Sequence, residues 1–175
     1  MLLPALTLLV AASASNFNPA TTAATAAAAV VLRGDVELRD GLLLLRGHSE
    51  PFDGILVEHW SPTRRKAEVP VRGGRVDGIT RGWYESGVQE VEESFRAGVS
   101  HGWRTRWHSN GALKSRVWIQ HGNLCGAFRE WHPNGRLARV TPLKAGQADG
   151  LVRGWEVDGS SGGLAVVKAG KPVGR

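Results

Sequence analysis

Cysteine is almost absent from this chain of 175 residues, because Cys125 is the only one. A disulfide within the chain is therefore excluded, and cysteine usage does not indicate a redox compartment. Cys125 precedes a glycine, as do the residues at the equivalent positions of related segments, which are Asp77, His101, Asp149 and Val173. We therefore expect a tolerated small side chain at this position rather than a reactive thiol.

Short motifs that mark common catalytic centres are absent as well. The chain has neither a G-x-S-x-G nucleophile elbow nor P-loop spacing, and it has no H-x-x-x-H pair. His108 and His132 hold equivalent places in neighbouring segments that would lie ~10 Å apart, which is too far to share one zinc ion. Glu90 and Glu92 share a strand face with no second carboxylate opposite them. We therefore expect no enzyme activity, no cofactor and no metal site.

Long runs of Lys or Arg are also missing, although the chain is basic, with a formal net charge of +6 and a sequence pI of about 10.2. The densest cluster is Arg64-Arg65-Lys66, which we expect at a solvated hairpin tip. Arms that bind nucleic acid carry longer basic runs, so no nucleic acid is expected as a partner. The charge leaves an anionic membrane surface open as a partner.

Residues 1–31 contain no charged side chain. Leu2 to Val10 is apolar, and Ala12-Ser13-Ala14 has the small-x-small form of a signal-peptidase site, although no Lys or Arg precedes it. The apolar stretch is too short to span a membrane. Residues 1–30 are therefore predicted to be a signal peptide followed by a low-complexity Ala/Thr segment. The protein is then exported, to the periplasm or beyond, and it is cytoplasmic if the segment is not a signal.

What the chain has in abundance is glycine at a fixed spacing. Six glycines recur every 24 residues, and two further series share this period. The first series comprises Gly54, Gly78, Gly102, Gly126, Gly150 and Gly174. A fixed period of this length predicts a repeat protein, and such arrays usually serve as binding surfaces. Residues 54–175 are therefore predicted to be an array of five 24-residue units, with an N-terminal hairpin cap over residues 31–53.

Each unit is predicted to be a hairpin of two strands of about six to eight residues. Asn110-Gly111 is a strong signal for a type I′ turn, in which both central residues have φ > 0. A second turn, containing Gly98, Gly122 or an equivalent, also requires φ > 0 and leads to the next unit. Because parallel strands would need longer crossovers, we expect an all-β, elongated antiparallel hairpin array that forms a single-sheet meander. The other tip turns are Ser86-Gly87, Asn134-Gly135 and Asp158-Gly159, and Asp40-Gly41 is a further turn upstream.

Alternation along the first strand of each unit predicts that its first, third and fifth residues share one face. The fifth position is tryptophan in four units, and arginine recurs at the third. Such a column is either a packed spine or a ladder on which a partner docks. The residues expected to bind a partner are Trp83, Tyr84, Trp107, Trp131, Trp155, Arg81, Arg129 and Arg153. Those expected to shape turns are Gly54, Gly78, Gly102, Gly126, Gly150, Gly174, Gly111 and Gly135.

The second strand of each unit has its own apolar column, and the spacing alone leaves open which face this column shares. The column comprises Val71, Phe95, Ile119, Leu143 and Val167. An open array also has two sheet edges, and we expect a hairpin of Val36–Leu38 and Leu42–Leu45 to cover the N-terminal one. The last unit, with Ser160-Ser161-Gly162-Gly163, is expected to be the loosest.

These units resemble the MORN-repeat variant of the bacterial YwqK family, antitoxins of toxin–antitoxin systems. The resemblance covers residues 36–174. It is carried by Gly78-Ile-Thr-Arg-Gly-Trp83-Tyr84-Glu-Ser-Gly87-Val and Gly126-Ala-Phe-Arg-Glu-Trp131-His-Pro-Asn134-Gly135-Arg-Leu137. It extends to unit ends such as Gly74-Arg-Val-Asp77-Gly78. It implies an extended hairpin array, a role in protein–protein contact and no catalytic residues.

Two functions follow from these observations. The first is a non-catalytic scaffold that binds a protein partner, with an antitoxin-like role included. The alternative is a module that binds a membrane surface or a cell-envelope polymer through its basic and aromatic face.

Overall fold

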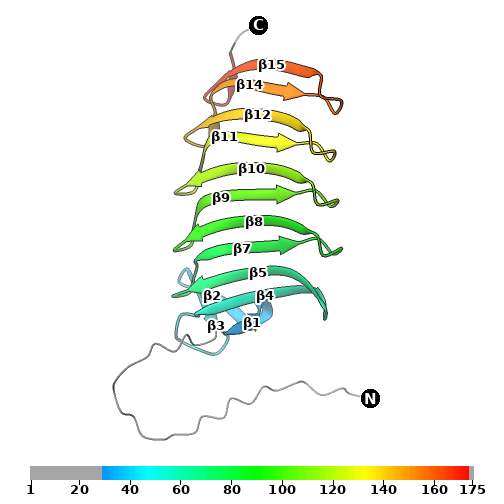
Figure 1. The fold of residues 1–175 in the computed structure, drawn as a ribbon. Coiled ribbons are helices and arrows are strands. Elements are labelled where there is room, and N and C mark those ends of the chain that lie inside the picture. Colours follow the sequence, from blue (N-terminus) through cyan, green and yellow to red (C-terminus); the bar gives the residue numbers. More distant parts are fainter. Residues whose placement is uncertain (1–28, 174–175) are drawn as a thin grey trace, which may run out of the picture.

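A computed structural model of the protein describes residues 29–173. Most of the predicted signal segment and the predicted turn residue Gly174 lie outside the described residues. Within them the chain is almost entirely β-strand, and the strands stack as a tall, narrow array (Figure 1). The predicted all-β array of antiparallel hairpins is therefore confirmed.

Ten strands of six to nine residues form the array as five successive hairpins. The hairpins are β4 (Gly54–Ser61) with β5 (Arg64–Arg72), β7 (Gly78–Trp83) with β8 (Gln89–Arg96), β9 (Val99–Trp107) with β10 (Leu113–Gln120), β11 (Asn123–Trp131) with β12 (Leu137–Lys144), and β14 (Gly150–Trp155) with β15 (Ser161–Lys168). Every neighbouring pair among these ten is antiparallel and sequential. The chain thus runs through the sheet as the predicted meander.

The remaining elements are short. They are β1 (Val30–Leu32), the 3₁₀ helix η1 (Arg33–Asp35), β2 (Val36–Arg39), β3 (Leu42–Leu45), β6 (Arg75–Val76), β13 (Gln147–Ala148) and β16 (Lys171–Pro172). β6 and β13 are separated from the strands that follow them by single residues, Asp77 and Asp149, whose N–H groups donate to Pro70 and Pro142. Proline lacks an N–H, so it cannot complete a regular ladder with the facing strand.

The turns that join the units adopt the type I′ geometry. Ala97 and Gly98 have φ of 49° and 85°, and His121 and Gly122 have 49° and 80°. The same pair of positive values occurs at Asp40 and Gly41, as predicted. Both central residues of a type I′ turn need positive φ, and its twist matches that of the flanking strands.

The tips of the hairpins differ from the prediction of type I′ turns. Asn110 is not among the residues with positive φ, whereas Gly111 has φ of 84°. The N–H of Gly111 donates to the oxygen of His108 at 2.9 Å, and the N–H of His108 donates to that of Ala112 at 2.8 Å. This is a three-residue loop with glycine in the left-handed region. Asn110 favours it, because its Oδ1 accepts the Ala112 N–H at 3.0 Å and its Nδ2 donates to the Pro133 oxygen of the next unit at 2.8 Å.

The N-terminal edge of the sheet is covered differently from the prediction. β1 pairs with β4 in parallel, with Val30–Leu32 opposite Ile55–Val57, so it is this short strand that occupies the edge. The predicted hairpin does form, as β2 with β3, but in a separate two-stranded sheet. The hairpin lies beside the first unit (Figure 1). Its apolar side chains pack with Phe52 and with Leu56 and Val71 of that unit. Burying that apolar surface outweighs the hydrogen bonds that edge pairing would give.

The ladder register separates two faces of the long sheet. On the first, which we call the core face, Val117 lies opposite Arg104 and Ile119 opposite Gly102, and both apolar side chains are buried. On the second, the open face, Trp103 lies opposite Trp118. The apolar column of the second strands belongs to the core face, since its members lie opposite the glycines that begin each unit, which we call the period glycines. These pairs are Val71 with Gly54, Phe95 with Gly78, Ile119 with Gly102, Leu143 with Gly126, and Val167 with Gly150.

The period glycines fill two steric roles. Gly102 has φ of 119°, and a Cβ there would lie 2.9 Å from the Cβ of Ser94. Gly78 and Gly150 have similar φ values, and a Cβ would meet Pro70 and Pro142 at 3.1 and 3.2 Å. Gly126 differs, because its φ is 76° and nothing lies within 4 Å of a Cβ there. The backbone angle requires glycine at every unit, and close packing adds to that requirement at most of them.

We therefore expect Gly102→Ala to destabilise the array more than Gly126→Ala does. The second change costs about 1 kcal/mol for a left-handed backbone, whereas the first adds a clash and a less accessible φ, for about 2 kcal/mol in all. Urea unfolding of the two variants, followed by tryptophan fluorescence, measures the difference. Equal losses of stability would show that backbone angle alone accounts for the repeated glycine.

Candidate interaction surface

One straight row of side chains crosses the middle of the open face from the first unit to the last. Each member is the direct ladder partner of the next, so neighbours in the row stand one strand apart, ~4.8 Å. The row is Val57, Glu68, Arg81, Glu92, Thr105, Arg116, Arg129, Val140, Arg153 and Leu164. It contains the three predicted arginines Arg81, Arg129 and Arg153, which the structure therefore places in one line.

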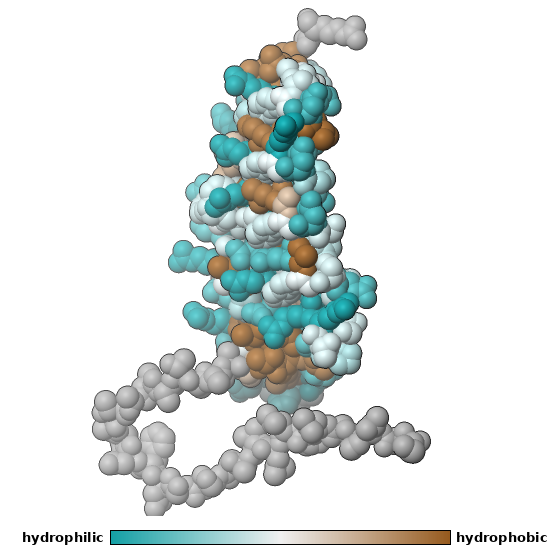
Figure 2. All heavy atoms as spheres, turned by 45° about the vertical axis from the view of Figure 1, so that its right-hand side comes forward, coloured by the Kyte–Doolittle hydropathy of each residue, from teal (hydrophilic) through white to brown (hydrophobic). Residues whose placement is uncertain are grey.

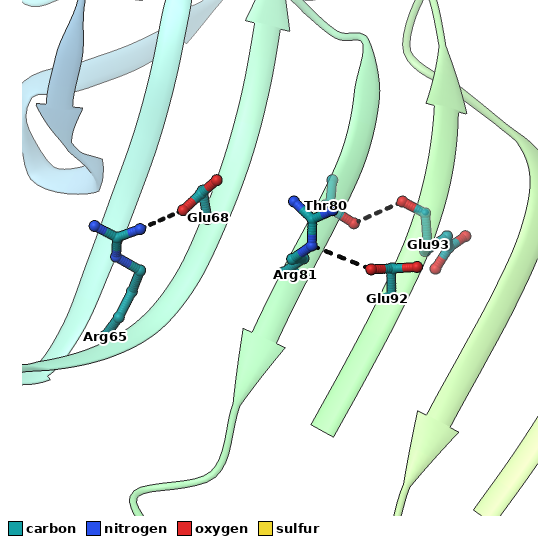
Figure 3. Close-up of polar contacts among 6 residues, drawn as sticks. All are labelled: Arg65, Glu68, Thr80, Arg81, Glu92 and Glu93. Carbon is teal, nitrogen blue, oxygen red and sulfur yellow. Dashed lines mark hydrogen bonds and ion pairs between the residues drawn. The ribbon is translucent and has the colours of Figure 1, made fainter. Parts of the chain in front are cut away.

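The N-terminal part of this row is electrically compensated. Figure 3 shows Glu68 paired with Arg65 and Arg81 paired with Glu92, and Arg81 Nε donates to Glu92 Oε2 at 3.1 Å. Positive and negative side chains thus alternate across β5, β7 and β8. Arg81, although predicted to bind a partner, already has an acidic neighbour on each side.

The C-terminal part of the row is positive and uncompensated. Arg116, Arg129 and Arg153 are exposed, and none of them forms an ion pair with the residues that the structure describes. The described part of the chain, residues 29–173, shows the same asymmetry. Residues 29–101 contain 10 basic and 12 acidic residues, a net charge of −2, whereas residues 102–173 contain 11 basic and 4 acidic residues, a net charge of +7. The basic character of the protein is therefore concentrated in the last three units.

An aromatic cluster flanks the positive part of the row. The rings of Trp103 and Trp118 meet edge to face with centroids 5.3 Å apart, and they are 40% and 36% exposed. The Arg116 guanidinium lies 4.2 Å from the centre of the Trp103 ring, within range of a cation–π interaction. His101 packs edge-on against Trp118 at 6.1 Å. On the surface seen in Figure 2, apolar and pale side chains recur along the long axis between hydrophilic ones.

Arg116 and Trp118 were not among the predicted partner-binding residues. They lie on the second strand of their unit, at positions where the other units have different residue types, so periodicity does not mark them. The signal that finds them is the ladder register, which sets Trp118 opposite Trp103 and Arg116 opposite Arg129. Trp103 was not predicted either, because it lies at the first position of its strand and not in the tryptophan column at the fifth; the register brings its exposed indole to that of Trp118.

The predicted column of Trp83, Trp107, Trp131 and Trp155 lies near the hairpin tips, and all four are half-buried. Their backbone oxygens hold the units together, since each accepts a hydrogen bond from a side chain 23 residues earlier. The four donors are Trp60 Nε1, Tyr84 hydroxyl, His108 Nε2 and His132 Nε2, at distances of 2.8 to 2.9 Å. Tyr84, predicted to bind a partner, thus spans two units, and both histidines are engaged in the same way.

A second series of hydrogen bonds runs along the turns that join the units, and Cys125 occupies one position in this series. Asp53 Oδ1 accepts the N–H of Gly73 at 2.7 Å, and Asp77 Oδ2 accepts that of Ala97 at 2.9 Å. His101 and Asp149 accept longer bonds, of 3.5 and 3.4 Å, from the same place in the following turn. Cys125 occupies the equivalent position, where its Sγ lies 3.8 Å from the Trp118 oxygen instead. It is half-buried, as a small packed side chain would be.

The core face holds one ionised cluster at its centre. Both carboxylate oxygens of Glu93 accept hydrogen bonds from Arg104, at 2.6 and 2.7 Å, and Ser100 Oγ donates at 2.5 Å. Burial alone would raise the pKa of Glu93, but the hydrogen bonds from Arg104 and Ser100 outweigh it and hold that pKa below its ordinary value. The cluster is a structural ion pair that joins β8 to β9.

Nearer the hairpin tips, the core face carries a shallow groove of about 400 Å³. Lys114, Glu130 and Arg139 line it together with His108 and His132. Both imidazoles already contact backbone oxygens. The groove therefore offers one loose ion pair, Arg139 with Glu130 at 3.8 Å, besides Lys114 and Glu156. This arrangement supplies no nucleophile with an adjacent base.

Among residues 29–173 there is no group of three or more His, Cys, Asp or Glu side chains placed to bind a metal ion. The same part of the chain contains no helix with the length and apolar character needed to cross a bilayer. Comparisons with protein-family models, with curated proteins and with solved structures found no match to this chain.

Proposed function

We propose that the protein is a non-catalytic scaffold that binds another protein on the open face of its last three units. The observation that carries this proposal is the combination of exposed Trp103 and Trp118 with three uncompensated arginines on one unlayered sheet face. Tryptophan and arginine contribute most of the binding energy in protein interfaces. A face of this composition is a candidate hot spot.

The size of the face is also suitable. Six strands at ~4.8 Å and about eight residues at ~3.3 Å give an area of roughly 750 Å². Each partner in an interface of standard size contributes about 800 Å². The face could therefore be covered by one folded domain, and the resemblance to the MORN-repeat variant of the YwqK family supports a role of this kind, with a toxin as one candidate partner.

The charge asymmetry favours a second candidate, binding to an anionic membrane surface or envelope polymer. The net charge of +7 in residues 102–173 would attract such a surface. This function predicts co-sedimentation with anionic vesicles that weakens as salt is added. Binding absent at low salt would remove it.

Face-specific photo-crosslinking in the native host tests the scaffold proposal. We expect a photoreactive amino acid at Leu151, on the open face, to crosslink one discrete protein, and the same residue at Arg139, on the core face, to give much less of it. Trp103→Ala combined with Trp118→Ala should reduce the Leu151 adduct at least tenfold, because both indoles are exposed there.

Trp60→Ala serves as the matched control, since Trp60 is 45% exposed but lies in the first unit. Circular dichroism should show that all variants keep their strand content. Adducts that are equal from the two faces, or that survive loss of both open-face indoles, would contradict the assignment of this surface.

A further inference from the structure

Resting on the proposed function, we infer that the open face recognises an acidic, partly apolar segment of its protein partner, with Arg116, Arg129 and Arg153 as the carboxylate-binding row. Three features support this inference. They are the absence of acidic side chains beside these three arginines, the length over which the arginines extend, and the apolar residues beyond Arg153.

No carboxylate compensates this part of the face. Residues 102–173 contain four acidic residues, which are Glu130, Asp149, Glu156 and Asp158. Glu130 lies opposite Arg139 on the core face, and Asp149 accepts the Ala169 N–H at a joining turn. Glu156 lines the groove of the core face, and Asp158 accepts hydrogen bonds from Ser160 at a hairpin tip. In units one and two, by contrast, Glu68 and Glu92 alternate with arginine in the same row.

The three arginines extend over the length of a short extended peptide. Arg116 and Arg129 lie on adjacent strands, and Arg153 lies two strands further on, so the row spans about 14 Å. An extended segment of about five residues covers that length. Arg116 is held by the Trp103 ring, and a guanidinium with a fixed plane donates well to a carboxylate.

Apolar side chains continue the surface beyond the last arginine. Leu164 lies directly opposite Arg153 in the ladder, and Leu151 lies opposite Val166 in the neighbouring pair on the same face. All three apolar side chains are exposed. A polypeptide can place carboxylates on the arginines and apolar groups on these residues and on the Trp103–Trp118 pair. A nucleic acid or polysaccharide chain offers anions without aliphatic groups, so a protein segment fits the whole surface best.

Two pairs of substitutions distinguish binding by this arginine row from a general effect of net charge. Arg129→Gln with Arg153→Gln removes two positive charges from the open face. Lys114→Gln with Arg139→Gln removes two from the core face, where both line the groove. Both pairs lower the net charge by two, so any difference in affinity between them reflects where the lost charges lie.

The test uses the full chain and a fluorescein-labelled peptide of about twelve residues that alternates glutamate with leucine, followed by fluorescence anisotropy at low salt. We expect the peptide to bind, a glutamine–leucine peptide to bind far more weakly, and added salt to weaken binding. The open-face pair should lose about tenfold in affinity, and the core-face pair less than about twofold.

Single-stranded DNA and phosphatidylserine-containing vesicles serve as competing anions. Equal losses in the two variant pairs, no peptide binding at low salt, or tighter binding of either competitor through the same arginines would overturn the inference. The proposed function is tested separately by the Leu151 crosslink. A crosslinked protein without peptide binding would reject the acidic-segment inference alone, whereas peptide binding without any crosslinked protein would reject the scaffold proposal.

Discussion

Replacing Leu56 with alanine should lower the free energy of unfolding of the N-terminal part of the array by about 3–4 kcal/mol. Leu56 is 1% exposed and belongs to the cluster formed with Val36, Phe52 and Val71. It also opposes Val31 of β1 and Val69 of β5 in the ladder. One side chain thus joins the edge strand, the first hairpin and the β2–β3 hairpin, and its removal leaves a cavity that the surrounding strands cannot readily close.

Leu164→Ala is the matched control, because Leu164 is 69% exposed in β15. It should change stability by less than about 0.5 kcal/mol. Because units of a repeat array can unfold separately, hydrogen exchange measured strand by strand is the suitable readout. Protection should fall in β1 to β5 of the Leu56 variant and persist in β14 and β15. A uniform loss over all strands would show that the array unfolds as one unit.

Glu93→Ala is expected to be the second large perturbation, at about 3 kcal/mol. The change removes the carboxylate that binds Arg104 and Ser100 and leaves the Arg104 guanidinium, which is a third exposed, without its partner. Breaking a buried pair by deleting one member costs about 3–5 kcal/mol, and the partial exposure of Arg104 places the expected value at the lower end.

The neighbouring carboxylate provides the control. Glu92 points to the open face and pairs with Arg81 where both side chains are more than a third exposed, so Glu92→Ala should cost less than about 1 kcal/mol. Figure 3 shows the two glutamates on adjacent residues of β8. Urea unfolding of both variants, of Arg104→Ala and of the Glu93→Ala, Arg104→Ala double variant gives the coupling energy between Glu93 and Arg104. Similar costs at the two positions would show that burial on the core face does not matter.

The same ion pair predicts the pH dependence of stability. The pKa of Glu93 is lowered in the folded state below its ordinary value of 4.5, because the hydrogen bonds from Arg104 and Ser100 outweigh the opposing effect of burial. Its contribution is therefore fully present above that value, and it is lost as the pH falls through the lowered pKa. The melting temperature should fall below about pH 4.5 in the parent, and this part of the fall should be absent in Glu93→Gln. If the melting temperatures of the parent and of Glu93→Gln fell in parallel with pH, the acid sensitivity would arise from other groups.

The sequence by itself determined the repeat, its length and its architecture. Glycine every 24 residues, with turn residues between, leaves room only for sequential antiparallel hairpins, and the structure has them. It also placed Arg129 and Arg153 on one face, since residues at the same position of successive units must repeat in space. Local chemistry and a fixed period are sufficient for both conclusions.

Only the tertiary structure decided the turn type, the edge and the composition of the surface. Asn110 forms a bond to the next unit that selects the three-residue loop, and apolar contact draws the β2–β3 hairpin from the edge onto the core face. Irregularities in the ladder set which residues of the second strands share a face, and this register brings Trp118 to Trp103 and Arg116 to Arg129. Such contacts join residues of different strands and units, so no pattern along one strand contains them.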